Sequence, residues 1–135
     1  MKSILVIGLG RFGRHITRKL LEEGNSVLAV EKNEERADNA INILPDIQIA
    51  DATNETFIKS LGVNNFDLCV VAIGDNFQSA LEITVLLKDF GAKYILARAC
   101  KTYTANYCLN GADHVVYAER EMAERLAIKY GSKYF

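Results

Sequence analysis

The chain has 135 residues and a formal net charge of −1; half of its residues are hydrophobic and 24% are charged. This composition is typical of a soluble globular domain, and the length favours a single domain that is long enough to bury a core. The sequence has no run of 18 apolar residues, which excludes a membrane-spanning helix, and no Lys/Arg cluster, which argues against nucleic acid as a partner. Because its start lacks the features of a signal peptide, we expect a cytoplasmic protein.

Six short apolar runs predict β-strands. They cover residues 3–8, 26–30, 47–50, 67–74, 94–98 and 114–118. Most of these runs are almost continuously apolar, which indicates strands that are covered on both faces, as in a parallel sheet.

Helical periodicity separates the strands. The predicted apolar stripes are Phe12, Ile16 and Leu20; Ala37, Ala40, Ile41 and Leu44; Phe77, Leu81, Val85 and Leu86; and Met122, Leu126 and Tyr130. Predicted N-caps are Asn33, Asn54 and either Asp75 or Asn76. Strands that alternate with helices predict an α/β protein of the Rossmann type, with a doubly wound six-stranded parallel sheet in the order 3-2-1-4-5-6.

A glycine-rich loop follows the first predicted strand. Gly8, Gly10 and Gly13 fit the pattern G-x-G-x-x-G, and the loop opens the first helix. In this context Gly8 permits the tight turn, Gly10 lets phosphate groups approach the backbone, and Gly13 lets the helix pack closely on the strand. The free N–H groups of the helix then bind an anion. The alternative is a glycine-rich turn without a ligand.

Acidic residues follow the second and third strands. Glu31 ends the second strand, where a carboxylate accepts hydrogen bonds from the ribose of an adenosine and repels a 2′-phosphate; Lys32 could soften that exclusion. Asp51 and Thr53 could line the adenine pocket or cap the next helix. The alternative for Glu31 is a solvated charge at the end of a strand.

Three further charged residues belong to the same crevice. Arg11 lies in the first turn of a helix, where a cation costs roughly 0.3–1 kcal/mol unless an anion compensates it, and the alternative is a solvated side chain. Arg98 ends the fifth strand and could bind phosphate or form a structural ion pair. Glu119 follows the sixth strand and could hold a divalent cation, or simply be a favourable acidic residue in a first helical turn.

The three cysteines carry no redox or metal signal. Cys69, Cys100 and Cys108 are odd in number and lack the CxxC spacing, so we expect buried free thiols.

Six stretches of the sequence together resemble the RCK/KTN (TrkA-N) domain, the nucleotide-binding regulator of Ktr and Trk potassium transporters and related channels. They are "VIGLGRFGRHI", "VLAVEKNEE", "ADAT", "LGVNNFDLCVVAIGDNFQSAL", "ILARA" and "GADHVVYAEREMAERLA". They cover nearly the whole chain in the order of the family, and the likeness is greatest to the cytosolic subunit of the Ktr type.

The resemblance implies a regulatory subunit that binds ATP or ADP, with NAD(H) as a further candidate, and that is not an enzyme. It also implies a homodimer that assembles into an octameric ring on a membrane potassium-translocating subunit, at the inner face of the cell membrane. By this resemblance Arg11 contacts the terminal phosphate of ATP and Glu119 holds a divalent cation, Mg or Ca. The predicted nucleotide site comprises Gly8, Gly10, Arg11, Phe12, Gly13, Glu31, Lys32, Asp51, Ala52, Thr53, Ala72, Ile73, Gly74 and Arg98.

The sequence departs from the family pattern at three places. Ala118 replaces the usual proline before the metal-associated glutamate, and Glu31 replaces the more common aspartate. Subunits of the Ktr type also carry a second, C-terminal ligand domain. We therefore expect residues 1–135 to form the N-terminal domain alone, as a shortened chain or a one-domain member. Two other function classes stay open: an NAD-dependent oxidoreductase domain and a structural domain whose glycine loop has lost its ligand.

Overall fold

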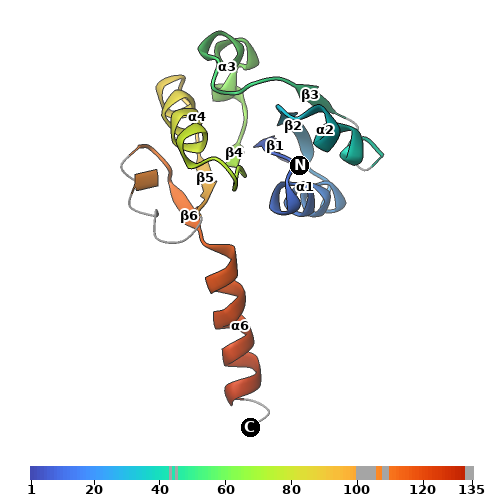
Figure 1. Ribbon diagram of the computed structural model, residues 1–135, viewed down its shortest axis with the longest axis vertical. Helices are drawn as coiled ribbons and strands as arrows, with labels where there is room; N and C mark the ends of the chain where they lie inside the picture. The colour runs from blue at the N-terminus through green and yellow to red at the C-terminus, as the bar shows by residue number, and fades with distance from the viewer. Residues whose placement is uncertain (43, 45, 100–105, 108–109, 133–135) are drawn as a thin grey trace.

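A six-stranded parallel sheet forms the centre of the computed structural model, which describes residues 1–42, 44, 46–99, 106–107 and 110–132 (Figure 1). The strand order is β3-β2-β1-β4-β5-β6, and every adjacent pair is parallel. This arrangement confirms the predicted Rossmann-type sheet. The order reverses direction between β1 and β4, which is where ligands bind in open α/β sheets.

The elements follow the predicted alternation of strands and helices. The strands are β1 Ser3–Ile7, β2 Ser26–Glu31, β3 Ile47–Ile49, β4 Leu68–Val71, β5 Ile95–Arg98 and β6 His114–Val116. The helices are α1 Arg11–Glu22, α2 Glu34–Ala40, α3 Glu55–Leu61, α4 Phe77–Asp89 and α6 Ala118–Ser132, with a short 3-10 helix at Val63–Asn65. The helix expected between the fifth and sixth strands falls largely outside the described residues, as do Cys100 and Cys108.

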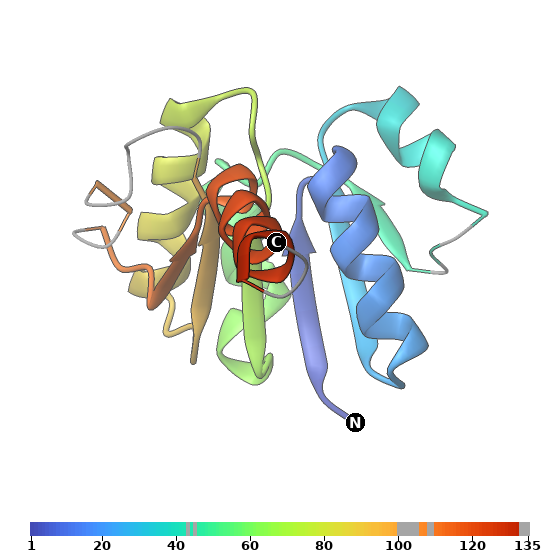
Figure 2. The ribbon, with the colours of Figure 1, turned by 90° about the horizontal axis from the view of Figure 1, so that it is seen from below.

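Helices cover both faces of the sheet (Figure 2), and each face buries its own set of side chains. Along β1, Ile4 and Val6 contact the layer of α1, whereas Leu5 and Ile7 join the larger core beneath α3 and α4. This alternation follows from the two-residue repeat of a strand. Because both sets are buried and apolar, β1 reads as a continuous apolar run in the sequence. Cys69 is a buried free thiol, as expected.

Two predicted apolar stripes differ from the observed ones. Helix α2 ends at Ala40, so Ile41 lies beyond the helix and is 63% exposed, although it was expected on the buried stripe. In α4 the fully buried residues are Ala80, Ile83, Thr84 and Leu87, whereas the predicted stripe of Phe77, Leu81, Val85 and Leu86 is only partly buried. Thr84 tolerates burial because its hydroxyl donates a 2.8 Å hydrogen bond to the carbonyl of Ala80.

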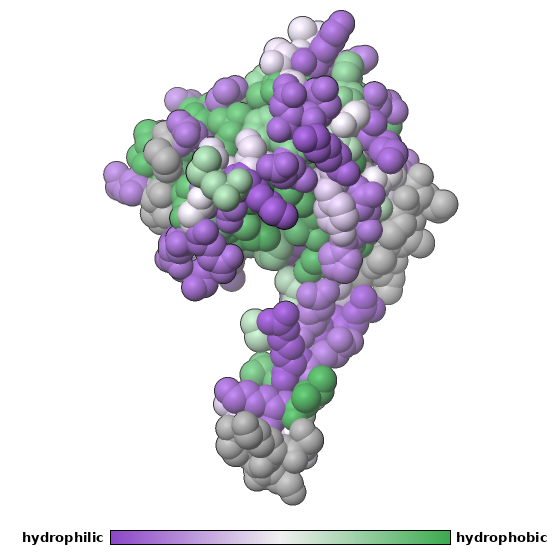
Figure 3. Space-filling model, turned by 180° about the vertical axis from the view of Figure 1, so that it is seen from behind, coloured by the Kyte–Doolittle hydropathy of each residue, from purple (hydrophilic) through white to green (hydrophobic). Residues whose placement is uncertain are grey.

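Helix α6 projects away from the sheet (Figures 1 and 3). Its predicted apolar stripe is real in spacing, but Met122, Leu126 and Tyr130 are all exposed, together with Ile128. Tyr134 and Phe135, the last two residues of the sequence, lie outside the described residues. None of the helices in the described part of the chain is long and apolar enough to cross a membrane.

Candidate functional site

A cavity of about 620 Å³ opens at the carboxyl ends of the central strands, beside the point where the strand order reverses. This volume lies within the range of small-molecule sites in proteins. The glycine loop, the ends of β2, β4 and β5, and the segment after β3 line it. Backbone from several strands therefore faces one space, as a dinucleotide-type fold requires.

Each of the three glycines in the loop is required, or tolerated, for a different structural reason. Gly8 has φ +103°, and a Cβ on it would stand 3.0 Å from the backbone of Ala72. A Cβ on Gly13 would overlap the carbonyl oxygen of Gly8, so this glycine allows α1 to approach the loop closely. A Cβ on Gly10 would instead meet no atom within 4 Å and would point into open space; Gly10 lines the cavity. The cradle at Gly10 is therefore free for a ligand.

The amino terminus of α1 lacks the side-chain cap that other helices possess. Asn33, Asn54 and Asn76 each accept a hydrogen bond from the backbone of their helix, as the sequence predicted for these N-caps. Helix α1 starts after Gly10 with no side-chain cap and no acidic residue in its first turn. Its first residue is Arg11, which is exposed at the cavity. Uncapped N–H groups and a nearby cation suit a bound anion.

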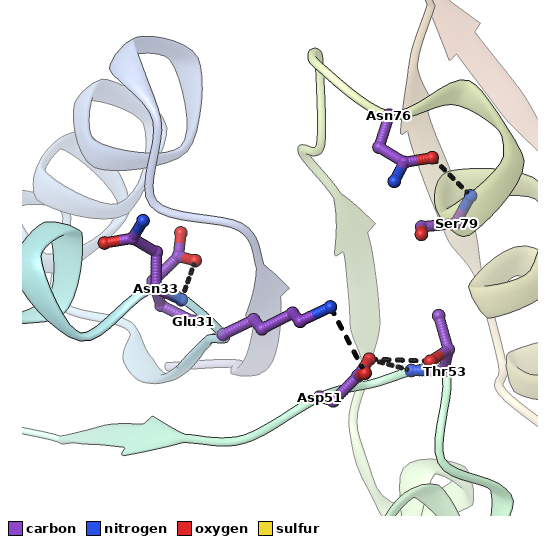
Figure 4. A network of polar contacts seen from close by, with 7 residues as sticks. Glu31, Asn33, Asp51, Thr53, Asn76 and Ser79 are labelled. Carbon is purple, nitrogen blue, oxygen red and sulfur yellow. Dashed lines mark hydrogen bonds and ion pairs between the residues drawn. The ribbon is translucent and has the colours of Figure 1, made fainter.

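Glu31 connects the end of β2 to the glycine loop. Its side chain is buried, and one carboxylate oxygen accepts a hydrogen bond from the backbone N–H of Leu9 at 2.8 Å. The other oxygen accepts from the backbone N–H of Asn33 at 2.7 Å (Figure 4). The carboxylate still lines the cavity, and each oxygen can accept more than one hydrogen bond. Glu31 therefore fixes the loop at the edge of the cavity, and its role as a ribose acceptor stays a prediction. The hold of Glu31 on the loop was not predicted.

Asp51 is held in place by Thr53. The Thr53 hydroxyl and backbone N–H donate to one Asp51 oxygen at 2.7 and 2.9 Å, and the other oxygen lies 3.5 Å from the Lys32 ammonium. The hydrogen bonds from Thr53, with a smaller contribution from Lys32, hold the pKa of Asp51 below its ordinary value. Asp51 and Thr53 both line the cavity, but neither caps the next helix, because the N-cap of α3 is Asn54. Their place in an adenine pocket stays a prediction.

A second ion pair joins the two halves of the cavity rim. Arg36 on α2 donates to Asp75, which follows β4, with 2.9 Å between Nη2 and Oδ2. The N-cap of α4 is Asn76, which accepts from the backbone N–H of Ser79 at 3.0 Å (Figure 4). Of the two residues predicted as candidates for this N-cap, Asn76 is the cap, and Asp75 forms the ion pair with Arg36.

Arg98 reaches the cavity from the end of β5. Its guanidinium lies 5.7 Å from the centre of the Phe12 ring, which is a cation–π distance. Glu119 lies in the first turn of α6 and is exposed; it is not among the residues that line the cavity. The described residues contain no cluster of three or more metal-ligating side chains. The metal role of Glu119 stays a prediction.

The cavity brings together all the predicted nucleotide-site residues except Gly13, which serves the packing of α1. Several lining residues were not predicted as site residues, among them Asn33, Arg36, Asp75, Asn76 and Ser79. Asn33 and Asn76 could be predicted as N-caps from the sequence. A helix that follows a strand of a parallel sheet starts at the carboxyl edge of that sheet, so these caps were expected near the cavity. Arg36 gave no such signal, because an arginine on a short helix is usually solvated.

Comparison with known proteins gives the family. The TrkA-N domain model matches residues 4–118. Ktr system potassium uptake protein C of Bacillus subtilis is 41% identical over 93% of this chain, and Ktr system potassium uptake protein A of Vibrio alginolyticus is 33% identical over 95%. The chain spans 58% and 59% of the length of these two relatives. A solved NAD(P)-binding domain of an exopolyphosphatase-related protein from Archaeoglobus fulgidus superimposes with a TM-score of 0.85 at 25% identity, covering 97% of this chain and 98% of that one. By this evidence the chain belongs to the TrkA-N domain family.

Proposed function

We propose that the chain is a regulatory adenine-nucleotide-binding module of a potassium transporter or channel. The proposal that the ligand is a nucleotide rests on Gly10. Because this residue has no Cβ, open space is left at the uncapped amino terminus of α1. Phosphates bind there, and Glu31 accepts from the ribose hydroxyls. The potassium role rests on the similarity to the two Ktr system potassium uptake proteins.

The ligand is ATP or ADP, with NAD(H) as a further candidate. Arg11 favours a ligand with a terminal phosphate, because its exposed side chain at the amino terminus of α1 can form a charge-assisted contact with such a phosphate. We also propose, on the family resemblance alone, that Glu119 holds a divalent cation; this residue lies on α6, outside the lining of the cavity. The solved relative from Archaeoglobus fulgidus is described as NAD(P)-binding, which supports the dinucleotide alternative.

The chain works as a homodimer that assembles into an octameric ring against a membrane potassium-translocating subunit, on the cytoplasmic side. Helix α6 supports this proposal, because Met122, Leu126, Ile128 and Tyr130 expose apolar surface on an element that leaves the sheet (Figure 3). Sedimentation of the purified chain should show a dimer or larger species, and removal of residues 119–135 should give a monomer. A monomeric intact chain at high micromolar concentration would contradict this assembly.

The nucleotide site is tested by Gly10→Val. The added side chain would occupy the cavity rather than collide with protein, so the fold should survive while the affinity for ATP, ADP and NADH collapses. The matched control is Gly131→Val on α6, where an added Cβ also meets no atom within 4 Å. Calorimetric titration with each nucleotide, together with the melting temperature, separates binding from folding. Unchanged affinity in a folded Gly10→Val variant would show that phosphates bind elsewhere.

The module is proposed to bind without turnover. The similarity to the two Ktr system potassium uptake proteins supports this proposal. An assay of NADH oxidation with candidate carbonyl substrates tests this point. Turnover that is lost in Gly10→Val would overturn the proposal in favour of an oxidoreductase domain.

A further inference from the structure

Two cations flank the carboxylate that is proposed to hold the ribose, and each is paired with an acid from another element. We propose that Asp75 is a specificity-determining positioning residue: by holding Arg36 across the cavity rim, it makes the site prefer adenine nucleotides with a free 2′-hydroxyl over those with a 2′-phosphate. The inference rests on the proposed nucleotide function, and it concerns the part of the same cavity that is proposed to hold the ribose.

Arg36 lies where it could contact a 2′-phosphate on a ribose that is bound to Glu31. Both residues line the cavity, and they belong to β2 and to the helix that directly follows it. The pKa of Arg36 is raised, first by the hydrogen bond from its guanidinium to Asp75, and also by the charges of Asp75 and Glu31. The guanidinium therefore lies within electrostatic reach of the Glu31 carboxylate. A 2′-phosphate on a ribose bound to Glu31 would enter the surroundings of this cation.

An unpaired arginine at this position would attract a 2′-phosphate. A guanidinium donates two parallel hydrogen bonds to phosphate oxygens, and this contact would offset the repulsion from Glu31. In the structure one of these donors, Nη2, is already bonded to Asp75 at 2.9 Å. The same pair adds the Asp75 carboxylate to the lining of the cavity while it engages the arginine. Asp75 therefore disfavours a 2′-phosphate in two ways, by its charge and by its hold on Arg36.

The second cation, Lys32, is held less directly. Its ammonium lies 3.5 Å from Asp51, and that carboxylate is fixed mainly by Thr53. The Lys32 side chain is 75% exposed, compared with 44% for Arg36. Water and salt screen an exposed lysine more strongly, so the arginine contributes more to the discrimination. Lys32 thus supplies an internal comparison for the experiment.

The ion pair between Arg36 and Asp75 is too exposed to contribute much to stability. The Asp75 side chain is 61% exposed, and exposed ion pairs contribute little to the free energy of unfolding. Its removal should leave the melting temperature almost unchanged. A change in ligand preference without a change in stability would therefore separate the proposed role from a structural one.

The test compares the dissociation constants of NADH and NADPH, and of AMP and adenosine 2′,5′-bisphosphate, for the intact chain and its variants. The intact chain should favour the ligands with the free 2′-hydroxyl. Asp75→Asn should reduce this preference about three- to tenfold, and Asp75→Glu, which keeps the charge, should retain most of it. Adding Arg36→Gln to Asp75→Asn should remove the gained 2′-phosphate affinity, whereas adding Lys32→Gln should leave most of it.

The control for net charge is Asp38→Asn, which removes an exposed acid from the same helix as Arg36 but not from the lining of the cavity. This variant should leave the preference unchanged. The inference is overturned if Asp75→Asn changes the preference less than twofold, if Asp38→Asn changes it equally, or if the gain does not depend on Arg36. If neither these four ligands nor ATP and ADP bind the intact chain, the proposed nucleotide function falls as well; normal AMP binding with an unaltered preference removes only the role of Asp75.

Discussion

The replacement Glu31→Gln tests whether one carboxylate organises the glycine loop. In the structure the two oxygens of Glu31 accept from two backbone N–H groups, those of Leu9 and Asn33. Glutamine has nearly the same shape, but it offers one oxygen and one NH2 group. Whichever way the amide turns, one backbone donor then faces another donor. The variant therefore removes one hydrogen bond and the negative charge while it leaves the packing intact.

The magnitude follows from the different exposure of the two donors. Leu9 is buried, so its N–H cannot bond to water, whereas Asn33 is exposed. We expect the amide oxygen to stay with Leu9 and the Asn33 bond to be lost. A hydrogen bond to a charged group contributes roughly 1.5–3 kcal/mol to the free energy of unfolding. For a chain of this size such a loss lowers the melting temperature by roughly 5–12 °C.

Thermal unfolding without nucleotide, followed by circular dichroism, measures this loss. The matched control is Glu23→Gln at the end of α1, an exposed acid with no hydrogen bond or ion pair of its side chain among the described residues. If Glu31→Gln melts within about 2 °C of the unmodified chain, the two hydrogen bonds do not organise the loop. Titration of the same variant should also show weaker binding of ATP, ADP and NADH together. Selective loss of one nucleotide would contradict a ribose role for Glu31.

Three further predictions follow from single residues. Gly13→Ala should leave little folded protein, measured as soluble yield and melting temperature, because the new Cβ overlaps the carbonyl of Gly8; a normal melting temperature would contradict it. Arg11→Ala should reduce the preference for ATP over ADP in calorimetric titration while sparing ADP, and an unaltered preference would oppose the phosphate role. Burial raises the pKa of Cys69 to about 12, so iodoacetamide at pH 8 should not modify it until denaturant unfolds the chain; peptide mass spectrometry would detect earlier modification, which would refute the burial argument.

The sequence predicted the sheet well because its strands are covered on both faces. Ile4 to Ile7 is an unbroken apolar run, and the structure buries these residues alternately on two sides. The right-handed crossover rule then leaves few possible strand orders. Helix faces were harder to predict where a helix is apolar on more than one side. In α4 the partly buried Leu81 and the fully buried Ile83 could both belong to the inner face, and the periodicity did not decide between them.

Residues whose role depends on the backbone were easier to place than those whose role depends on a distant side chain. Gly8 and Gly13 serve a local turn and a contact between neighbouring elements, so a motif of six residues determines their positions. Glu31 was located by its place at the end of β2. Its contact with Leu9, 22 residues away, was not predicted because it requires the loop to curl back over the strand end.

The ion pair of Arg36 with Asp75 marks the limit of prediction from the chain alone. The partners are 39 residues apart, and each would ordinarily be a solvated charge. Only the doubly wound topology, which brings the segment after β4 beside the helix after β2, lets them meet over the cavity. Because an exposed pair adds little stability, no apolar pattern around it reveals the contact. A residue of this kind becomes visible only when the structure assembles the cavity, and there its contribution concerns which ligand enters rather than whether the chain folds.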